Sequence, residues 1–444
     1  MMEFSAEKCY DCSKIGSGIP RSVWNPVREE RVEKDMIRIK EEANLCLNCK
    51  KPRCVAACPI QTPIPQMIQL FKEGRVTDAA QQLFDNNPMS VVCAMVCNHE
   101  AQCEGHCIRG IKGAPVSWSS IERYLSDTGL ERVQIPKEAP TGKNVAIIGS
   151  GPAGITAAIK LVQKGHDVTI FEAESMIGGM LQYGIPEFRL PKSLLERYCR
   201  KLKDIGIHIR LHTAIGTSLM ISDLMRDGYD AVMISSGLWR ARPLGIPGES
   251  LPNVCYGIHY LAAPNSFTLH KRLAVIGSGN TAMDVARTAL HRGVEYVTVY
   301  GRSGSGAADS KELELAELEG ADFAYGLQIT RITREGPVFR KCVLDENGKA
   351  VGVTGEEELH PADFTIIAAS QGPKSKLINT TNGLEGTDRG LLKVDGNGMT
   401  TVRGVFAAGD VVHGGKTVVE AVAEAKAVAE AIHTYLSQEP ECQE

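Results

Sequence analysis

The chain has 444 residues, of which 43% are hydrophobic and 23% charged, and its formal net charge at pH 7 is −4. Its length predicts two or three domains with full cores, and its balanced charge gives no reason to expect nucleic acid or an anionic membrane as a partner. No apolar run approaches the roughly 18 residues of a membrane span, and the first residues lack a signal-peptide pattern, so we expect a soluble, cytoplasmic protein.

Cysteines crowd the beginning of the chain, where ten of the fourteen lie before residue 108. A first group has the spacing C-x2-C-x4-C-x3-C-P, and a second lies in CAMVCNHEAQCEGHC. The two groups are Cys46, Cys49, Cys54 and Cys58, and Cys93, Cys97, Cys103 and Cys107. In a reducing compartment such a crowd indicates metal binding rather than a disulfide framework.

Soft sulfur ligands suit iron–sulfur clusters or zinc, and the eight thiolates could fill two four-ligand sites. Zinc would be only a structural staple, because it has no redox chemistry. In ferredoxin-type runs, the cysteine that precedes the proline reaches across to the neighbouring cluster. By this analogy Cys46, Cys49 and Cys54 hold one cluster, and Cys58 helps to hold the second.

Short helical patterns follow the first cysteine group. Apolar residues recur there at spacings of three and four, as in amphipathic helices: Met67, Ile68, Phe71, Ala79, Ala80, Leu83 and Phe84. The stretch from Glu131 to Asn144 is polar, contains two prolines and a glycine, and is typical of a linker. We therefore predict a helical, cluster-binding domain over residues 1–135.

After the linker, the pattern of strand, glycine turn, helix and strand appears twice, beginning at Asn144 and at Arg272. Such units build open parallel sheets with helices on both faces. The fold class is therefore α/β, with two doubly wound Rossmann-like nucleotide-binding domains preceded by the helical domain. We expect the first to be split, over residues 140–243 and 372–444, around a second inserted at 244–371.

The first glycine loop has the features of a dinucleotide site. Gly149 permits a tight turn, Gly151 lets the backbone approach a pyrophosphate, and Gly154 allows close helix packing. Glu172 ends the next strand, where a carboxylate can accept hydrogen bonds from a ribose 2′-OH.

The second glycine loop, GSGNTAMD, has Gly277 and Gly279, with Ala282 where a third glycine could stand. No acid closes its second strand, and Arg302 stands there instead. A carboxylate would repel a 2′-phosphate, whereas a guanidinium can pair with it, so this unit favours NADPH, with NADH left open.

A third element follows near the end of the chain, where an apolar strand ends in Gly409-Asp410 and a helix starts near Thr417. This arrangement resembles the second signature of flavoproteins with two dinucleotide-binding domains. The resemblance implies that Asp410 binds the ribityl chain of FAD and that the following helix points its N-terminus at the flavin, where its dipole stabilises negative charge.

The order of these elements resembles the small subunit of NADPH-dependent glutamate synthase, and is similar to the N-terminal half of dihydropyrimidine dehydrogenase and to its separate bacterial flavin subunit. The resemblance runs from about Glu42 to Glu430. Its most specific stretches are LCLNCKKPRCVAACP, CEGHCIRG, IGGMLQYGIPEFRLPK and GSGNTAMD.

The resemblance implies FAD, two [4Fe–4S] clusters and NADPH as cofactors, and it implies ligands for each. One cluster takes Cys46, Cys49, Cys54 and Cys107; the other takes Cys58, Cys97, Cys103 and Glu122, with Cys93 as the alternative to Glu122. Residues at the flavin are Gly149, Gly151, Pro152, Ala153, Gly154, Glu172, Gly179, Arg189, Gly409, Asp410 and Thr417. Residues at the nicotinamide coenzyme are Gly277, Gly279, Asn280, Thr281, Ala282 and Arg302.

We therefore predict an oxidoreductase that passes electrons from NAD(P)H through FAD and the clusters to a separate subunit, as in the glutamate synthase small subunit, within a hetero-oligomer. No general base is expected, because hydride transfer is the chemistry of the cofactors themselves. The alternatives are a flavin subunit of a dihydropyrimidine dehydrogenase or of an electron-bifurcating NAD(P)H:ferredoxin oxidoreductase, and a zinc-stapled nucleotide-sensing scaffold.

Three features depart from the relatives. Gly301 precedes Arg302 where NADPH-specific relatives often have a second basic residue. The loop GRSGSGAADSK is glycine-rich and lacks the further arginines that some relatives use on the 2′-phosphate. Cys9 and Cys12 form an extra C-x2-C, which we expect to be unpaired thiols, with a contribution to another metal site as the alternative.

Overall fold

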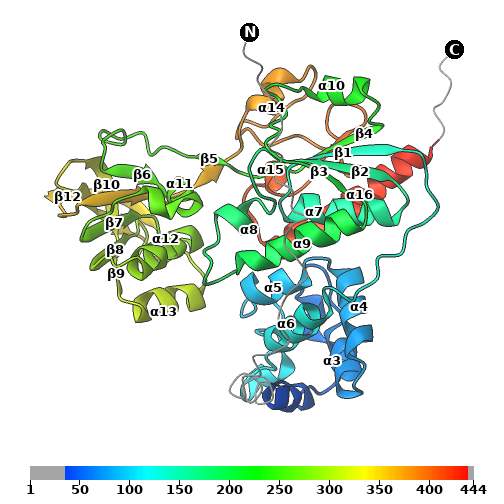
Figure 1. Cartoon of the computed structure of the whole chain (residues 1–444). Coiled ribbons are helices and arrows are strands. Elements are labelled where there is room, and N and C mark those ends of the chain that lie inside the picture. Colours follow the sequence, from blue (N-terminus) through cyan, green and yellow to red (C-terminus); the bar gives the residue numbers. More distant parts are fainter. Residues whose placement is uncertain (1–35, 439–444) are drawn as a thin grey trace, which may run out of the picture.

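The computed structural model describes residues 36–438, so Cys9 and Cys12 lie outside the described residues. Figure 1 shows a helical part at the bottom of the molecule, one sheet above it on the right and a second sheet on the left. The fold class predicted from the sequence is confirmed, because both large sheets are parallel and are flanked by helices.

The helical part packs short amphipathic helices around one apolar core. After a helix over 36–44, its helices are α2 (Arg53–Ala56), α3 (Ile64–Lys72), α4 (Val76–Asn86), α5 (Ser90–Val96), η2 (Ile108–Ile111) and α6 (Trp118–Gly129). All seven apolar residues predicted to face inward here are buried. A proline in its first turn favours the start of α3, because the nitrogen of proline needs no helical partner.

The first sheet has the strand order β15-β4-β1-β2-β3 and is parallel throughout. Its strands are β1 (Asn144–Ile148), β2 (Asp167–Phe171), β3 (His208–Arg210), β4 (Ala231–Ile234) and β15 (Val405–Ala407). The helices between and after them are α7 (Pro152–Gln163), α8 (Met180–Tyr183), α9 (Lys192–Asp204), α10 (Ile221–Arg226), α14 (Lys376–Thr380), α15 (Asp410–His413) and α16 (Val418–Ser437). The strand β15 returns from near the C-terminus to complete this sheet, and α16 packs along α7.

The second sheet has the order β6-β13-β7-β8-β9, also parallel. Its strands are β6 (Val254–Tyr256), β7 (Arg272–Ile276), β8 (Tyr296–Tyr300), β9 (Ala321–Ala324) and β13 (Phe364–Ile367), with helices α11 (Gly257–Ala262), η3 (Pro264–Ser266), α12 (Asn280–His291) and α13 (Ser310–Leu318). An antiparallel sheet of β10 (Leu327–Ile332), β11 (Pro337–Leu344) and β12 (Ala350–Leu359) is inserted between β9 and β13.

The chain crosses between the two large sheets twice, and the two crossings pair with each other. They form the antiparallel ribbon of β5 (Arg240–Ala241) and β14 (Gln371–Gly372). We propose this ribbon as the boundary between the predicted spans 140–243 and 372–444 on one side and the inserted span 244–371 on the other.

The helical part is firmly joined to the first sheet. One continuous apolar core includes Met89 and Val92 of the helical part together with α7 and α16. Lys160 and Lys426, from those two helices, donate hydrogen bonds to the carbonyl oxygens of Asp85 and Asn86 at the end of α4, at 2.9 and 2.6 Å. Cations at this end of a helix also interact favourably with its dipole.

Among residues 36–438, no helix combines the length and the apolar character that crossing a membrane requires.

Candidate functional site: two nucleotide cavities beside the cysteine groups

The first glycine loop has the geometry that a dinucleotide needs. Gly149 has a φ of +102°, and a Cβ there would lie 2.6 Å from the carbonyl oxygen of Ser235. A Cβ on Gly154 would lie 2.1 Å from the carbonyl oxygen of Gly149. At Gly151, by contrast, nothing lies within 4 Å of an added Cβ. The loop therefore needs glycine at its outer positions for packing, and it leaves open space at the centre, at the N-terminus of α7.

This open space belongs to a cavity of about 650 Å³. Ten of the eleven residues predicted at the flavin line it: Gly149, Gly151, Pro152, Ala153, Glu172, Gly179, Arg189, Gly409, Asp410 and Thr417. Gly154 lies behind the loop instead, where it permits the close contact of helix and strand. A long cavity that begins at a helix N-terminus fits a dinucleotide with its pyrophosphate over α7.

Glu172 is buried at the edge of this cavity and is held from both sides. Its Oε2 accepts hydrogen bonds from the backbone N–H and the hydroxyl of Ser150, and its Oε1 accepts one from the N–H of Glu174 at 2.9 Å. A carboxylate has about four acceptor positions, so Glu172 can still accept a ribose hydroxyl.

Asp410 and the start of α16 form the opposite wall. Burial raises the pKa of the Asp410 carboxyl to about 6, and this carboxylate accepts the backbone N–H of Lys416 at 3.1 Å. Thr417 and Glu420 cap α16 reciprocally. The predicted helix start at Thr417 is confirmed, and the positive end of the α16 dipole faces the cavity.

The second glycine loop repeats this construction beside a cavity of about 1000 Å³. Gly277 has a φ of +124°, and a Cβ there would lie 2.5 Å from the carbonyl oxygen of Ala368, whereas Gly279 faces open space. Asn280, Thr281 and Arg302 line the cavity. Ala282 is fully buried behind the loop, so its small side chain serves helix packing.

Contact with a neighbouring side chain explains why glycine stands at position 301, where NADPH-specific relatives often have a basic residue. A Cβ at this position would lie 2.7 Å from the ring of Tyr325, so a basic side chain there would require this ring to shift. Arg302 is exposed at the cavity edge next to Ser303. Arg302 thus places a positive charge in the cavity lining just after the end of β8.

The two cavities adjoin. Both are lined by Ile258, Asn280, Thr281, Gln371, Gly415 and Lys416. Ligands in the two cavities could therefore come into contact across these shared residues. Hydride transfer requires such contact between the two ring systems.

Three cysteines of the first group and two of the second surround a separate cavity of about 190 Å³. It is lined by Cys46, Cys49, Cys54, Cys103 and Cys107. All four cysteines predicted to hold one cluster thus lie together, although they come from segments more than 50 residues apart. Burial, together with the neighbouring Cys107 and Cys46, raises the pKa of the Cys54 thiol to about 11.

The second set gathers at the contact of α5 and α6. Cys97 directly follows α5, and its charge would interact with those of Glu122 and Cys103; Cys103 is also near Cys58. Glu122 lies in the first half of α6 with only 4% of its surface exposed, and burial raises the pKa of its carboxyl well above the usual value. Cys93 lies one turn before Cys97 and close to Glu122, so both alternatives for the fourth ligand are present.

The described cysteines are free thiols, and soft sulfur donors grouped in this way fit iron–sulfur ligation. Among residues 36–438, no group of three or more histidine, cysteine or acidic side chains is arranged to hold a metal ion. The ligand sets deduced from the sequence therefore stay predictions.

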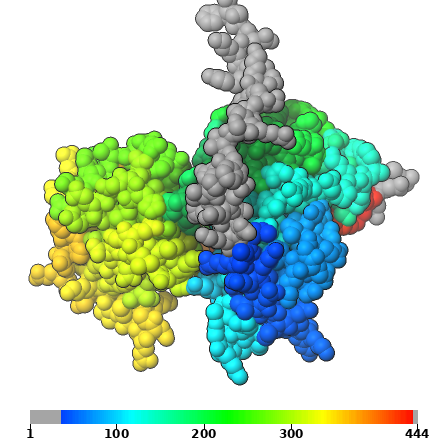
Figure 2. Space-filling view, turned by 60° about the horizontal axis from the view of Figure 1, so that its bottom comes forward, coloured from blue at the N-terminus to red at the C-terminus, as the bar shows by residue number. Residues whose placement is uncertain are grey.

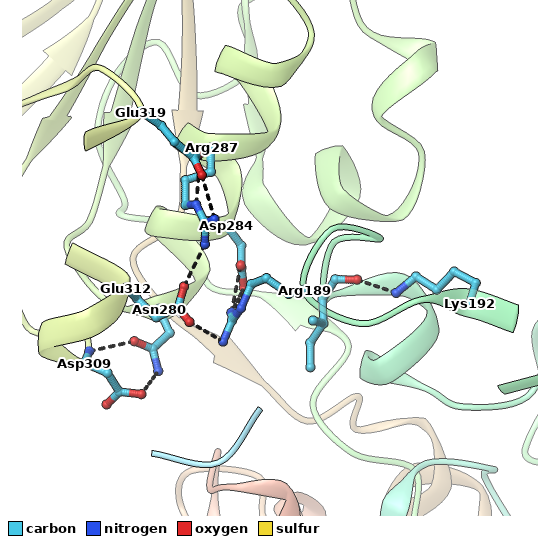
Figure 3. A network of polar contacts seen from close by, with 9 residues as sticks. Arg189, Lys192, Asn280, Asp284, Arg287, Asp309, Glu312 and Glu319 are labelled. Atoms are coloured by element: carbon cyan, nitrogen blue, oxygen red, sulfur yellow. Dashed lines mark hydrogen bonds and ion pairs between the residues drawn. The ribbon is translucent and has the colours of Figure 1, made fainter. Parts of the chain in front are cut away.

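A network of charged side chains beside the flavin cavity was not predicted. Arg189 donates to both oxygens of Asp284 at 2.8 Å and also pairs with Glu312, while Arg287 pairs with Glu312 and Glu319 (Figure 3). Burial raises the pKa of the Asp284 carboxyl to about 6 despite its arginine partner. The sequence did contain one signal for this network: Asp284 lies on the otherwise apolar face of the helix predicted after the second glycine loop. A buried carboxylate needs a partner, so a cation could have been expected beside it.

Comparisons with known proteins agree with this geometry. Residues 143–425, more than half of the chain, match the family described as pyridine nucleotide-disulphide oxidoreductase. Residues 24–134 match the family described as dihydropyrimidine dehydrogenase domain II, 4Fe-4S cluster.

Two curated relatives and one solved structure illustrate the likeness. The chain is 35% identical to the glutamate synthase [NADPH] small chain of Halomonas elongata, over 89% of this chain and 90% of the relative. It is 34% identical to the NAD-dependent dihydropyrimidine dehydrogenase subunit PreT of Escherichia coli O157:H7, over 90% of this chain and 95% of the relative. FprA from Mycobacterium tuberculosis in complex with NADPH shares the fold, with a TM-score of 0.58 and 21% identity over 66% of this chain and 84% of FprA.

FAD, a nicotinamide coenzyme and [4Fe–4S] chemistry, all expected from the motifs, are confirmed at the level of these families, whereas the number of clusters stays a prediction. The chain therefore belongs to the pyridine nucleotide-disulphide oxidoreductase family and, within it, to the FAD/iron–sulfur oxidoreductases that include the glutamate synthase small chains.

Proposed function

We propose that this chain oxidises NADPH and delivers the electrons one at a time to a separate subunit, as the small subunit of a glutamate synthase. When bound, the nicotinamide supplies a hydride, FAD accepts it, and iron–sulfur clusters carry single electrons onward. The residues of the chain bind these groups, hold them in contact and exclude water.

One observation carries this proposal. The wall of the flavin cavity includes Asn280 of the second glycine loop and also Val96 and Asn98, the two neighbours of Cys97. The second glycine loop and the two residues that flank Cys97, a predicted ligand of the second cluster, thus border the same cavity. This arrangement supports a path from coenzyme to flavin and from flavin to a cluster held by Cys58, Cys97, Cys103 and Glu122.

The other predicted cluster, held by Cys46, Cys49, Cys54 and Cys107, would then be the exit toward the partner. Apolar side chains of its lining are exposed, among them Leu47 at 63% and Ile108 at 40%. Lys51, Arg53 and Arg109 also line this cavity. A central apolar contact with a charged rim is typical of protein–protein interfaces, and its basic rim favours an acidic partner surface.

Purified full-length chain, assembled with its cofactors, should bleach its flavin on mixing with NADPH, contain about eight irons and reduce artificial acceptors. It should form no glutamate without an amidotransferase-type partner subunit. Glutamate formation by the chain alone, or zinc in place of iron, would contradict the proposal.

A second candidate is the flavin subunit of a dihydropyrimidine dehydrogenase. It is favoured by the 34% identity to PreT, of which 95% is covered. The two candidates share the whole chain described above; they differ in the partner and, because PreT is named as NAD-dependent, in the coenzyme. Adding a purified amidotransferase-type synthase subunit or a purified pyrimidine-reducing subunit, and measuring the oxidation of NADPH and of NADH coupled to each, discriminates between them.

Coenzyme choice rests on Arg302, the cation at the end of β8 in the cavity lining. The proposal expects NADPH to be preferred, because a guanidinium can pair with the 2′-phosphate. A clear preference for NADH in steady-state rates would overturn this part alone.

A further inference from the structure

The residue just before α13, Asp309, fastens the second glycine loop. Its Oδ2 accepts a hydrogen bond from Nδ2 of Asn280 at 3.0 Å, and its backbone N–H donates to Oδ1 of Asn280 at 2.8 Å (Figure 3). Both polar atoms of the Asn280 side chain are therefore occupied. Asn280 is the first residue of α12 and borders both nucleotide cavities, so its orientation is fixed at their junction.

The other carboxylate oxygen of Asp309 reaches the helical part. Its Oδ1 accepts a hydrogen bond from Nδ2 of Asn98 at 2.5 Å. The Oδ1 of Asn98 accepts the N–H of Ala101 at 3.0 Å, so this side chain is also held at both ends. Asn98 follows Cys97 directly. One carboxylate thus links the nucleotide loop to the loop that carries a predicted cluster ligand.

Asp309 precedes a helix but does not use its carboxylate to cap it. An aspartate that precedes a helix normally accepts a hydrogen bond from a backbone N–H of the first turn. Asp309 makes no such capping bond to α13. Both of its oxygens are instead turned to Asn98 and Asn280, so the helix start gives up its cap in favour of the bridge.

The second sheet and the helical part have separate apolar cores, so the link from Asn98 to Asp309 is one of the few contacts described between them. The main apolar core of the second sheet is built from residues between Cys255 and Ala368. The helical part, by contrast, shares a core with the first sheet. Figure 2 shows the blue and cyan helical part beside the yellow atoms of the second-sheet unit. The contacts described between these two bodies are polar, from Asn98 to Asp309 and from Glu100 to Ser310.

We propose that Asp309 is a positioning residue for hydride transfer, which ties the nucleotide loop at Asn280 to the cluster loop at Asn98 and so fixes the glycine loop of the second cavity against the flavin cavity. This inference rests on the proposed function for its consequence in catalysis. A misplacement of about 1 Å at a reacting centre can cost up to about a hundredfold in rate.

The test uses the full-length, cofactor-loaded protein and follows flavin bleaching after rapid anaerobic mixing with NADPH over a range of concentrations. In Asp309→Ala the limiting rate should fall about tenfold or more, while the apparent Kd for NADPH changes less than about threefold. Asn98→Ala should show the same loss, and the double variant should be no slower than Asp309→Ala, because both remove one bridge. Asp309→Asn keeps one acceptor oxygen and the backbone bond and should recover part of the rate.

Glu100→Gln is the matched control. Glu100 also connects the cluster loop to the start of α13, through Ser310, but it does not touch Asn280. Its limiting rate should stay within about twofold of the native rate, because the bridge is intact. A native rate in Asp309→Ala, or an equal loss in Glu100→Gln, would overturn the inference.

Hydrogen exchange without coenzyme separates this inference from the proposed function. The amides of residues 277–284 should exchange faster in Asp309→Ala and Asn98→Ala and not in Glu100→Gln, because only the first two release the loop. If exchange is unchanged, the bridge inference fails. If the native flavin is not reduced by NADPH although exchange responds as expected, the proposed function fails and the bridge stands.

Discussion

The two helix-side glycines of the first loop should respond differently to the same added methyl group. Gly151 has φ −70° and ψ −175°, an extended conformation open to any residue, and an added Cβ meets no atom within 4 Å. Gly151→Ala should therefore change the stability of the apoprotein by less than about 1 kcal/mol, because alanine restricts the unfolded chain but is a poorer N-cap for α7 than glycine.

The same methyl group at Gly154 would lie 2.1 Å from the carbonyl oxygen of Gly149 and 2.8 Å from the hydroxyl of Ser235. Helix propensity favours alanine by about 1 kcal/mol. Overpacking against backbone costs about 1–3 kcal/mol or more. A contact of 2.1 Å to a backbone oxygen places the cost at the upper end of that range, so Gly154→Ala should destabilise the apoprotein by about 2 kcal/mol or more, measured by urea unfolding.

FAD affinity separates the two variants further. If the pyrophosphate lies over Gly151, the added methyl group occupies its place, and Gly151→Ala should bind FAD at least about tenfold more weakly, a loss of about 1.4 kcal/mol. Fluorescence titration of the apoproteins with FAD measures this directly. Native FAD affinity in a stable Gly151→Ala protein would refute the assignment of this cavity to the flavin.

Three further outcomes are expected. Cys58→Ala should lose the second cluster first and spare the cluster of Cys46, which iron content and electron paramagnetic resonance can check. Arg302→Ala should raise the KM for NADPH about tenfold or more and leave that for NADH unchanged, because it removes one charged pair with the 2′-phosphate; equal effects on both coenzymes would contradict it. Burial raises the folded pKa of Asp410 to about 6 from 3.8, so its contribution to stability is full below about pH 4 and is lost as the pH rises through 6. Asp410→Asn should therefore stabilise the apoprotein by up to about 3 kcal/mol at pH 8 and by almost nothing at pH 4, in urea unfolding at the two pH values.

The parts of the site that depend on local sequence could be predicted. The glycine loops at Gly149 and Gly277 need particular backbone conformations and close contacts, and these requirements leave a fixed spacing in the chain. The start of α16 at Thr417 was predictable for the same reason, since the cap and its partner Glu420 are only three residues apart.

The contacts between the parts of the molecule could not be predicted. Asp309 and Asn98 are separated by 211 positions, and Arg189 and Asp284 by 95. Nothing in the local pattern distinguishes Asp309 from an ordinary helix cap. Gly301 likewise appeared as a missing basic residue until the ring of Tyr325 was seen to occupy its side-chain space.

The cysteine ligands could be predicted only in part. The spacing of Cys46, Cys49 and Cys54 by itself predicts a shared metal site. That Cys107 joins this site and that Cys58 belongs to the second site came from analogy with ferredoxins and from the family resemblance. The structure brings Cys107 to the cavity lined by Cys46, Cys49 and Cys54, and it brings Cys58 near Cys103. It also keeps both Glu122 and Cys93 beside Cys97, so the choice between them needs a loaded protein.

Anaerobic reduction of the purified, cofactor-loaded chain by NADPH, followed together by flavin absorbance and low-temperature electron paramagnetic resonance, tests the central claim most directly. The account predicts that NADPH bleaches the flavin and that signals of reduced [4Fe–4S] clusters then appear in the same sample without any partner subunit. Bleaching of the flavin with the clusters left oxidised by excess NADPH, or the absence of iron, would contradict it.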